Sequence, residues 1–179
     1  GMINIWKEPI QAILPQLKDV YNTSLKHGLI DNALAAGMFH AYRSFFTGSL
    51  LQPLSKEVAL FIRNNLERHK RMVMHLCALP VSNGISCLRG SSFGPQYVEE
   101  FITEEHLAEA LRNKEFAACE AMFAIKMMCS FIFRRPDGIK PTARQYLELF
   151  ERHGSASAQF VNIYRLFYGG LLSLHYYRE

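Results

Sequence analysis

Apolar residues recur every three or four positions along most of the chain, the spacing that places them on one face of an α-helix. The first such segment is expected over 8–27, where the apolar positions are Ile10, Ile13, Leu14, Leu17, Val20, Tyr21 and Leu25. Gly28 is expected to end this helix, because glycine readily takes the left-handed conformation found just after helix ends.

The same period continues beyond Gly28, with capping and turn residues between the segments. Further helices are expected at about 31–48, 55–80, 103–112, 114–134, 142–154 and 155–177. Asp31 and Ser55 are the expected N-caps of the first two, and Pro80 is expected to close the helix that begins at Ser55. The turn formers of 81–95 predict the least regular stretch of the chain.

No segment alternates apolar and polar residues in the manner of a strand, and no linker or repeat interrupts the pattern. The sequence therefore predicts an all-α bundle of about seven to eight helices, forming a single domain over 2–179. Gly1, ahead of Met2, is interpreted as an expression scar, and the residues after it do not resemble a signal peptide.

Two of the expected helices, 114–134 and 156–177, are apolar on nearly every face. Glu120 and Lys126 lie inside the first, and a charge at the centre of a bilayer costs about 2.5–3.5 kcal/mol. Both are therefore predicted to be buried in protein and not in a membrane.

Two such helices also predict self-association, because a domain of this size encloses about one fully apolar helix. A homo-oligomer is expected, a dimer first and a trimer or hexamer as the alternative. Arg165 and Tyr168 are expected in or beside the contact between copies.

The charge and the cysteine content of the chain indicate which partners to expect and in which cellular compartment the protein is expected. The net charge of +4 is mild, and the densest basic cluster, 63–71, is interrupted by Glu67, so no nucleic-acid partner is predicted. The four cysteines form no Cys-x-x-Cys, which predicts reduced thiols and a cytoplasmic protein. Cys119 and Cys129 are interpreted as small hydrophobic residues of the core. No two histidines share a helix face with metal-ligand spacing, so neither a metal nor a cofactor is predicted.

Cys87 is the first candidate for chemistry, because Arg89 lies two residues away and a nearby cation lowers the pKa of a thiol. Cys77 is its candidate redox partner if the chain after Pro80 folds back on the preceding helix. The alternative is that Cys87 is an inert, half-buried thiol.

Further candidate catalytic or ligand-binding residues are polar residues that lie within or next to the expected helices. Glu67, Arg71 and His75 follow one another at four-residue spacing, which suits a proton relay or, alternatively, a solvated helix face. Arg89 and Arg165 are candidates for binding an anionic ligand, and a structural ion pair is the alternative for Arg165.

The order of helices and turns resembles the alkylhydroperoxidase D-like (AhpD-like) and carboxymuconolactone decarboxylase superfamily over about 55–179. The segments that carry the resemblance are Asn83-Gly84, Phe101-Ile102-Thr103-Glu104-Glu105-His106-Leu107, Gly138-Ile139-Lys140-Pro141-Thr142 and Tyr146-Leu147-Glu148-Leu149-Phe150-Glu151-Arg152-His153-Gly154. The resemblance implies an AhpD-like helical fold and an oligomer.

Active members of that superfamily carry Cys-x-x-Cys directly after Asn-Gly, with a histidine and a glutamate as proton relay. In that register this chain has Ile85 and Leu88 at the cysteine positions, Ser92 at the histidine and Val73 at the glutamate. We therefore expect a helical protein that has lost the dithiol peroxidase site and has a small-ligand-binding or structural role. The alternative is an antioxidant thiol peroxidase or oxidoreductase that uses Cys87.

Overall fold

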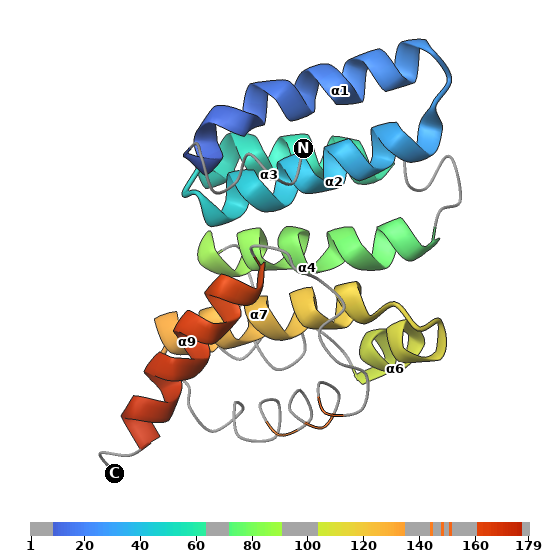
Figure 1. Ribbon diagram of the computed structural model, residues 1–179. Coiled ribbons are helices and arrows are strands. Elements are labelled where there is room, and N and C mark those ends of the chain that lie inside the picture. The colour runs from blue at the N-terminus through green and yellow to red at the C-terminus, as the bar shows by residue number, and fades with distance from the viewer. Residues whose placement is uncertain are drawn as a thin grey trace. The chain divides into compact units, whose positions relative to one another are not determined.

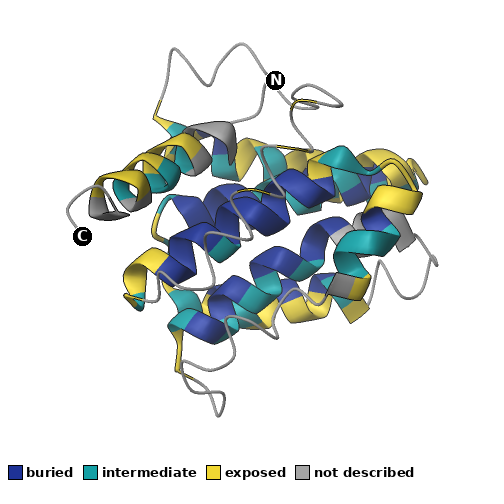
Figure 2. Cartoon of the chain, turned by 90° about the horizontal axis from the view of Figure 1, so that it is seen from below, coloured by how far each residue is buried: buried dark blue, intermediate teal, exposed yellow. Residues whose placement is uncertain are grey.

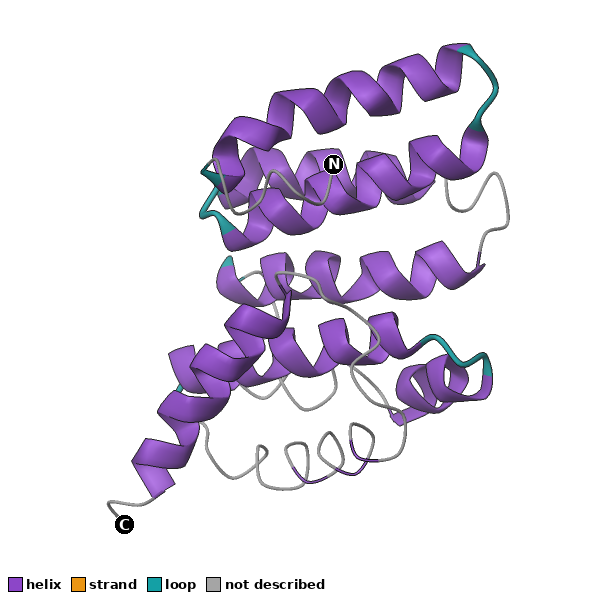
Figure 3. Cartoon of the chain, viewed as in Figure 1, coloured by secondary structure: helices purple, strands orange, loops and turns teal. Residues whose placement is uncertain are grey.

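The computed structural model describes residues 9–63, 72–90, 104–134 and 161–176, together with residues 144, 148 and 151. Within these ranges every regular element is a helix and none is a strand, which confirms the all-α prediction (Figure 3). The elements are a 3-10 helix at Ile10–Ile13, α1 (Leu14–Lys26), α2 (Ile30–Phe46), α3 (Leu51–Phe61), α4 (Met72–Leu88), α6 (Glu104–Arg112), α7 (Phe116–Ile132) and α9 (Val161–Tyr176). Among the described helices, none is both long and apolar enough to cross a membrane.

The chain divides into two compact units, Gly1–Ile85 and Ser86–Glu179, with the boundary inside α4. In the first unit α1 and α2 form an antiparallel pair, and α3 packs against α2 (Figure 1). A buried cluster of Leu34, Phe61 and Ala78 lies at the core of this unit. Whether the whole chain is one domain, as expected, stays a prediction.

In the second unit α7 is the buried element, with α6 and α9 packed against it (Figure 1). Twelve of its 17 residues are buried, as the apolar pattern of 114–134 predicted. Gly169 of α9 faces α7, since a Cβ at this glycine would lie 4.0 Å from the Met127 sulfur. Leu166, Phe167 and Leu174 of α9 are exposed, and in Figure 2 the helix that leads to the C-terminus is largely yellow and teal where it is described.

The predicted helix 55–80 is wrong at both ends. α3 begins at Leu51 and ends at Phe61, and α4 passes through Pro80 to Leu88, so most of the stretch expected to be irregular is helical. Val81 and Ile85 are 0% and 1% exposed, and they continue the helical spacing of the buried positions of α4. Burial of these side chains outweighs the backbone hydrogen bond that a proline removes from a helix interior.

A side-chain hydrogen bond accompanies the proline within α4. Pro80 has no N–H for the carbonyl four residues earlier, and the next carbonyl, that of Cys77, accepts a hydrogen bond from the Tyr42 hydroxyl at 2.5 Å. Tyr42 is buried, and burial raises the pKa of its hydroxyl well above the ordinary value, so the group remains a donor. This bond joins α2 to α4 within the first unit.

Other predicted boundaries fall close to the observed ones. α2 begins at Ile30, so Asp31 lies in its first turn and is not the N-cap, although a carboxylate there still favours the helix dipole. Residues 144, 148 and 151 are helical, in the expected segment 142–154. The expected turn at 136–138 and the caps of the last helix lie outside the described residues.

Among the described helix ends, those of α1, α2 and α6 share one arrangement of two hydrogen bonds. After α1 and α2, Gly28 and Gly48 take φ values of 70° and 78°, as predicted for helix-ending glycines. In each case the glycine N–H and the next N–H donate to carbonyls of the last helical turn, which is the Schellman arrangement.

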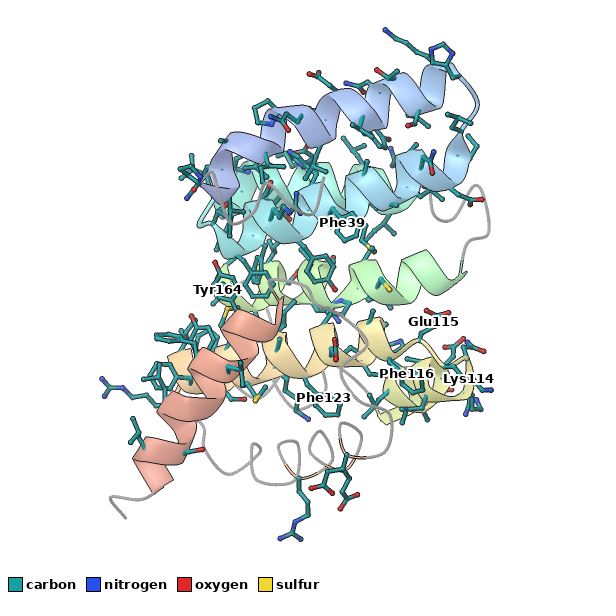
Figure 4. The ribbon with its side chains drawn as sticks, viewed as in Figure 1. Phe39, Lys114, Glu115, Phe116, Phe123 and Tyr164 are labelled. Carbon is teal, nitrogen blue, oxygen red and sulfur yellow. The ribbon has the colours of Figure 1, made fainter. Side chains whose placement is uncertain are left out.

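The end of α6 has the same hydrogen bonds without a glycine. The Lys114 N–H donates to the Leu111 carbonyl at 3.0 Å, and the Glu115 N–H donates to the Ala110 carbonyl at 2.8 Å. Lys114 therefore has a φ of 58°, a conformation that its Cβ disfavours. Figure 4 labels Lys114, Glu115 and Phe116 where α6 leads into α7. Glu115 follows this strained residue as the N-cap of α7, which begins at Phe116.

Replacing Lys114 by glycine is expected to stabilise the protein by about 0.5–1 kcal/mol, because the conformational strain is removed and only part of it is offset by glycine's unfolded-state entropy. Gly28→Ala is the matched control and is expected to destabilise by a similar amount. No atom lies within 4 Å of a Cβ at Gly28, so that change reports backbone conformation alone. Chemical denaturation, analysed with a common m-value, measures the free energy of unfolding of both variants. A denaturation midpoint of Lys114→Gly at or below that of the wild type would contradict the prediction.

Candidate functional site

Two thiols from different helices meet in the second unit. Cys87 lies one residue before the end of α4, and Cys129 lies in the last turn of α7. Their side chains are joined by a hydrogen bond. Cys87 is 9% exposed and Cys129 is 1% exposed, so Cys87 is the more accessible of the pair.

The hydrogen bond makes the two thiols chemically different. It lowers the pKa of Cys87 below its ordinary value, because the Cys129 S–H stabilises a Cys87 thiolate more strongly than burial disfavours it. The same bond, with burial and the charge of Cys87, raises the pKa of Cys129 far above its ordinary value. Cys87 is thus the thiol that ionises, and Cys129 keeps its proton and donates. A thiolate is the nucleophilic form of cysteine.

Aromatic side chains of α7 and α9 lie beside Cys129. The Tyr168 ring is 5.8 Å from the Phe131 ring and 5.2 Å from the Phe167 ring, between centroids. Burial raises the pKa of Tyr168, and negative charge on Cys129 would raise it further. Tyr168 therefore keeps its hydroxyl proton, in an apolar setting next to the thiol pair.

The other two thiols are not part of this pair. Cys119 is fully buried in α7, and burial is the main cause that raises its pKa to about 11, so it stays protonated. Cys77 lies ten residues before Cys87 on α4, a rise of about 15 Å along a helix, whereas bridged cysteines have Cα atoms within about 7 Å. The predicted Cys77–Cys87 pair is therefore wrong. It required the chain to fold back after Pro80, where α4 instead continues.

The remaining predicted residues are dispersed or undescribed. Arg89 follows α4 and is exposed. Glu67 lies outside the described residues, and the side chains of His75 and Arg165 are likewise not described, so their proposed roles stay predictions. Over the described part of the chain, no three His, Cys, Asp or Glu side chains are grouped as metal ligands would be.

Sequence reasoning missed Cys129 as a partner, since it was interpreted as a core residue. The pair spans two helices that are far apart in the chain, and no local spacing indicates it. Nor did the sequence indicate a second feature, in the first unit. This is a cavity of about 640 Å³ bordered by Lys18, His40 and Glu57. These three residues lie on three different helices, which again gives no sequence motif.

No protein-family model, curated protein or solved structure matches the chain. The AhpD-like resemblance therefore stays a prediction carried by residues and helix order. Independently of that resemblance, the described helices establish the all-α class.

Removing the Cys129 donor is expected to raise the pKa of Cys87, because burial, which disfavours the thiolate, is then no longer opposed by the hydrogen bond. Cys129→Ala should shift the midpoint of Cys87 alkylation by iodoacetamide to higher pH and slow alkylation at pH 7. Cys129→Ser is the matched control, because its hydroxyl can still donate, and it should keep most of the lowered midpoint. Rates are followed by mass spectrometry of the Cys87 peptide, and identical pH profiles for wild type and Cys129→Ala would refute this assignment.

Proposed function

We propose that this chain is a divergent AhpD-like helical protein that reduces peroxides, or acts as a thiol oxidoreductase, through Cys87 and Cys129. The proposal is supported by the proximity of these two thiols, one from α4 and one from α7, together with the opposite directions in which each shifts the pKa of the other. The positions that hold cysteines in active members of the superfamily remain Ile85 and Leu88 here. The proposed pair therefore uses positions different from those expected by the resemblance.

The pair suits a two-step reduction of a hydroperoxide, ROOH. The Cys87 thiolate attacks the outer oxygen and the O–O bond breaks, which forms a Cys87 sulfenic acid and an alkoxide that takes up a proton to leave as ROH. Formation of the sulfenic acid removes the negative charge of Cys87, which is one of the causes that raise the pKa of Cys129. The Cys129 thiolate then attacks the Cys87 sulfur, and the hydroxyl leaves with the released proton as water. The peroxide gains two electrons, the two thiols become one disulfide, and a thiol reductant must restore them. We expect this reductant in the cytoplasm, where thiols are kept reduced.

Accessibility indicates the size of the substrate. Cys87 is only 9% exposed, and its partner is almost fully enclosed. A bulky hydroperoxide would have to displace the side chains that enclose Cys87 to reach the thiolate. Hydrogen peroxide, the smallest member of the class, is the substrate that this geometry favours.

A small-ligand-binding role is the second candidate function. It is supported by the cavity of about 640 Å³ in the first unit, a volume within the range of about 300–1,000 Å³ usual for ligand sites. This role does not depend on the thiol pair, so the two are tested separately.

One equivalent of hydrogen peroxide, without reductant, is expected to consume two thiols and leave a Cys87–Cys129 disulfide in the wild type. Cys87→Ser should consume peroxide only at background rate. Cys129→Ser should stop at the sulfenic acid, which dimedone traps, because no thiol is adjacent to resolve it.

Cys119→Ser is the matched control for these variants, since Cys119 is a buried thiol of the same helix outside the pair. It is expected to react as the wild type does. Peptide mapping identifies the bridged residues, and equal background consumption by wild type and Cys87→Ser would remove the proposal.

We further propose that the chain forms a homo-oligomer through α9, a dimer first and a trimer or hexamer as the alternative. Leu166, Phe167 and Leu174 are 66%, 58% and 63% exposed on this helix, a cluster that water disfavours. Light scattering after size exclusion should give a multiple of the chain mass, and Leu166→Glu should lower it. Leu50→Glu, at an exposed leucine of the other unit, should not. A single-chain mass that persists on concentration would contradict this.

A further inference from the structure

The cavity of the first unit lies among α1, α2 and α3, the blue to teal helices of Figure 1. Its inner wall is apolar, formed by the buried side chains of Leu54, Val58 and Phe61 of α3. Gly37 of α2 completes the wall, where a Cβ would come within 2.5 Å of the Phe61 ring. The absence of a side chain at Gly37 therefore helps to set the position of that ring. An apolar cavity of 150 Å³ already holds a benzene molecule, so this larger one has room for about two fused rings.

Polar groups meet at one border of the cavity, one from each of the three helices. The Lys18 Nζ of α1 lies 3.2 Å from Glu57 Oε1 of α3 and forms an ion pair with it. The His40 Nδ1 of α2 lies 3.8 Å from the same oxygen, too long for a strong hydrogen bond. The side chain of His40 is only 15% exposed, whereas those of Lys18 and Glu57 are 60% and 45% exposed. The imidazole is therefore the inner polar group, and the ion pair is the outer one.

The charges at this border cancel. Burial is the main cause that lowers the pKa of His40, and Lys18 lowers it further, while Glu57 opposes both. The imidazole is therefore neutral at pH 7 and offers one ring nitrogen as an acceptor. Lys18 and Glu57 carry opposite charges, and Tyr21, the other titratable side chain that lines the cavity, is a phenol. A ligand with a net charge would meet one member of the ion pair as a like charge.

We propose that this cavity binds a neutral, mainly apolar molecule that carries one hydroxyl group, such as a phenol or an aryl alcohol. The apolar body lies against Leu54, Val58 and Phe61, where its burial supplies most of the binding free energy. The hydroxyl donates to His40 or to the Glu57 carboxylate and accepts from the Lys18 ammonium. The site lies wholly in the first unit and includes none of the proposed redox thiols.

The proposal is tested with the full-length protein and three probes that share one ring system. By isothermal titration calorimetry at pH 7, 2-naphthol is expected to bind with one-to-one stoichiometry, at least about tenfold more tightly than 2-naphthoate or 2-naphthylmethylammonium, because each ion loses solvation and meets a like charge. Absence of saturable 2-naphthol binding, or tighter binding of either ion, would overturn the proposal.

Location is tested by closing the mouth of the cavity. Asn22 is an exposed lining residue of α1, so Asn22→Trp should block binding and leave the fold intact. Thr23→Trp puts the same side chain on the next exposed position, which does not line the cavity, and should bind as the wild type does. Equal affinities for these two variants would place the ligand elsewhere and refute the site.

The role of His40 is tested by pH. Binding of 2-naphthol is expected to weaken only as the pH falls below the ordinary range of histidine, because burial lowers the pKa of His40 and the imidazole loses its acceptor when it gains a proton. 2-Naphthol itself does not ionise at acidic pH. His40→Gln keeps an acceptor that does not titrate and should flatten the profile. Circular dichroism confirms that both proteins stay folded, and identical profiles for the two would exclude His40 as the acceptor. Because these tests use neither Cys87 nor peroxide, their failure would not bear on the proposed peroxidase function.

Discussion

The burial of α7 is the constraint on which the second unit depends. Apolar residues occur on nearly every face of this helix, so the unit must supply neighbours on all sides, and α6 and α9 pack against it. Enclosure also determines the chemistry of its cysteines. In a medium of low polarity a thiol is inert unless a neighbour stabilises its thiolate, and this difference separates Cys87, which has such a neighbour, from Cys119, which stays protonated.

Packing against α7 has a further consequence for α9. Gly169 allows α9 to approach Met127, and the residues on the opposite side of the helix are then left in water. Among the side chains of α9 that the structure describes, the large apolar ones of Leu166, Phe167 and Leu174 are exposed within one copy of the chain. This incomplete burial is the physical basis for expecting a second copy.

In the first unit helix packing leaves an open space, whereas the packing of the second unit buries most of α7. Three amphipathic helices enclose a core but leave a cavity beside it, and the polar residues at its border come from α1, α2 and α3 in turn. Each of Lys18, His40 and Glu57 is an ordinary polar residue of an amphipathic helix when read along the chain. They form a candidate binding site only because helix packing brings them to one border of the cavity. There, burial lowers the pKa of the His40 imidazole, and the Lys18–Glu57 ion pair lies on the outer side.

The sequence by itself determined the helical class, the extents of α2, α6 and α7, and the glycine ends at Gly28 and Gly48, because these depend on interactions between residues a few positions apart. It did not indicate the 3-10 helix at Ile10–Ile13, which takes the place of the first turn of the helix expected over 8–27. It misjudged Pro80, since the burial of Val81 and Ile85 that carries α4 onward is a tertiary effect. It gave no sign that Lys114 would take a glycine conformation, because the need for that turn comes from the packing of α6 on α7. Cys87 was identifiable as a thiol candidate from its neighbours, but its partner was not. Only the tertiary structure shows that the partner of Cys87 is Cys129 and not Cys77. Cys77 is close to Cys87 in sequence, but the continuous helix α4 holds the two apart, whereas the packing of α7 brings the distant Cys129 beside Cys87.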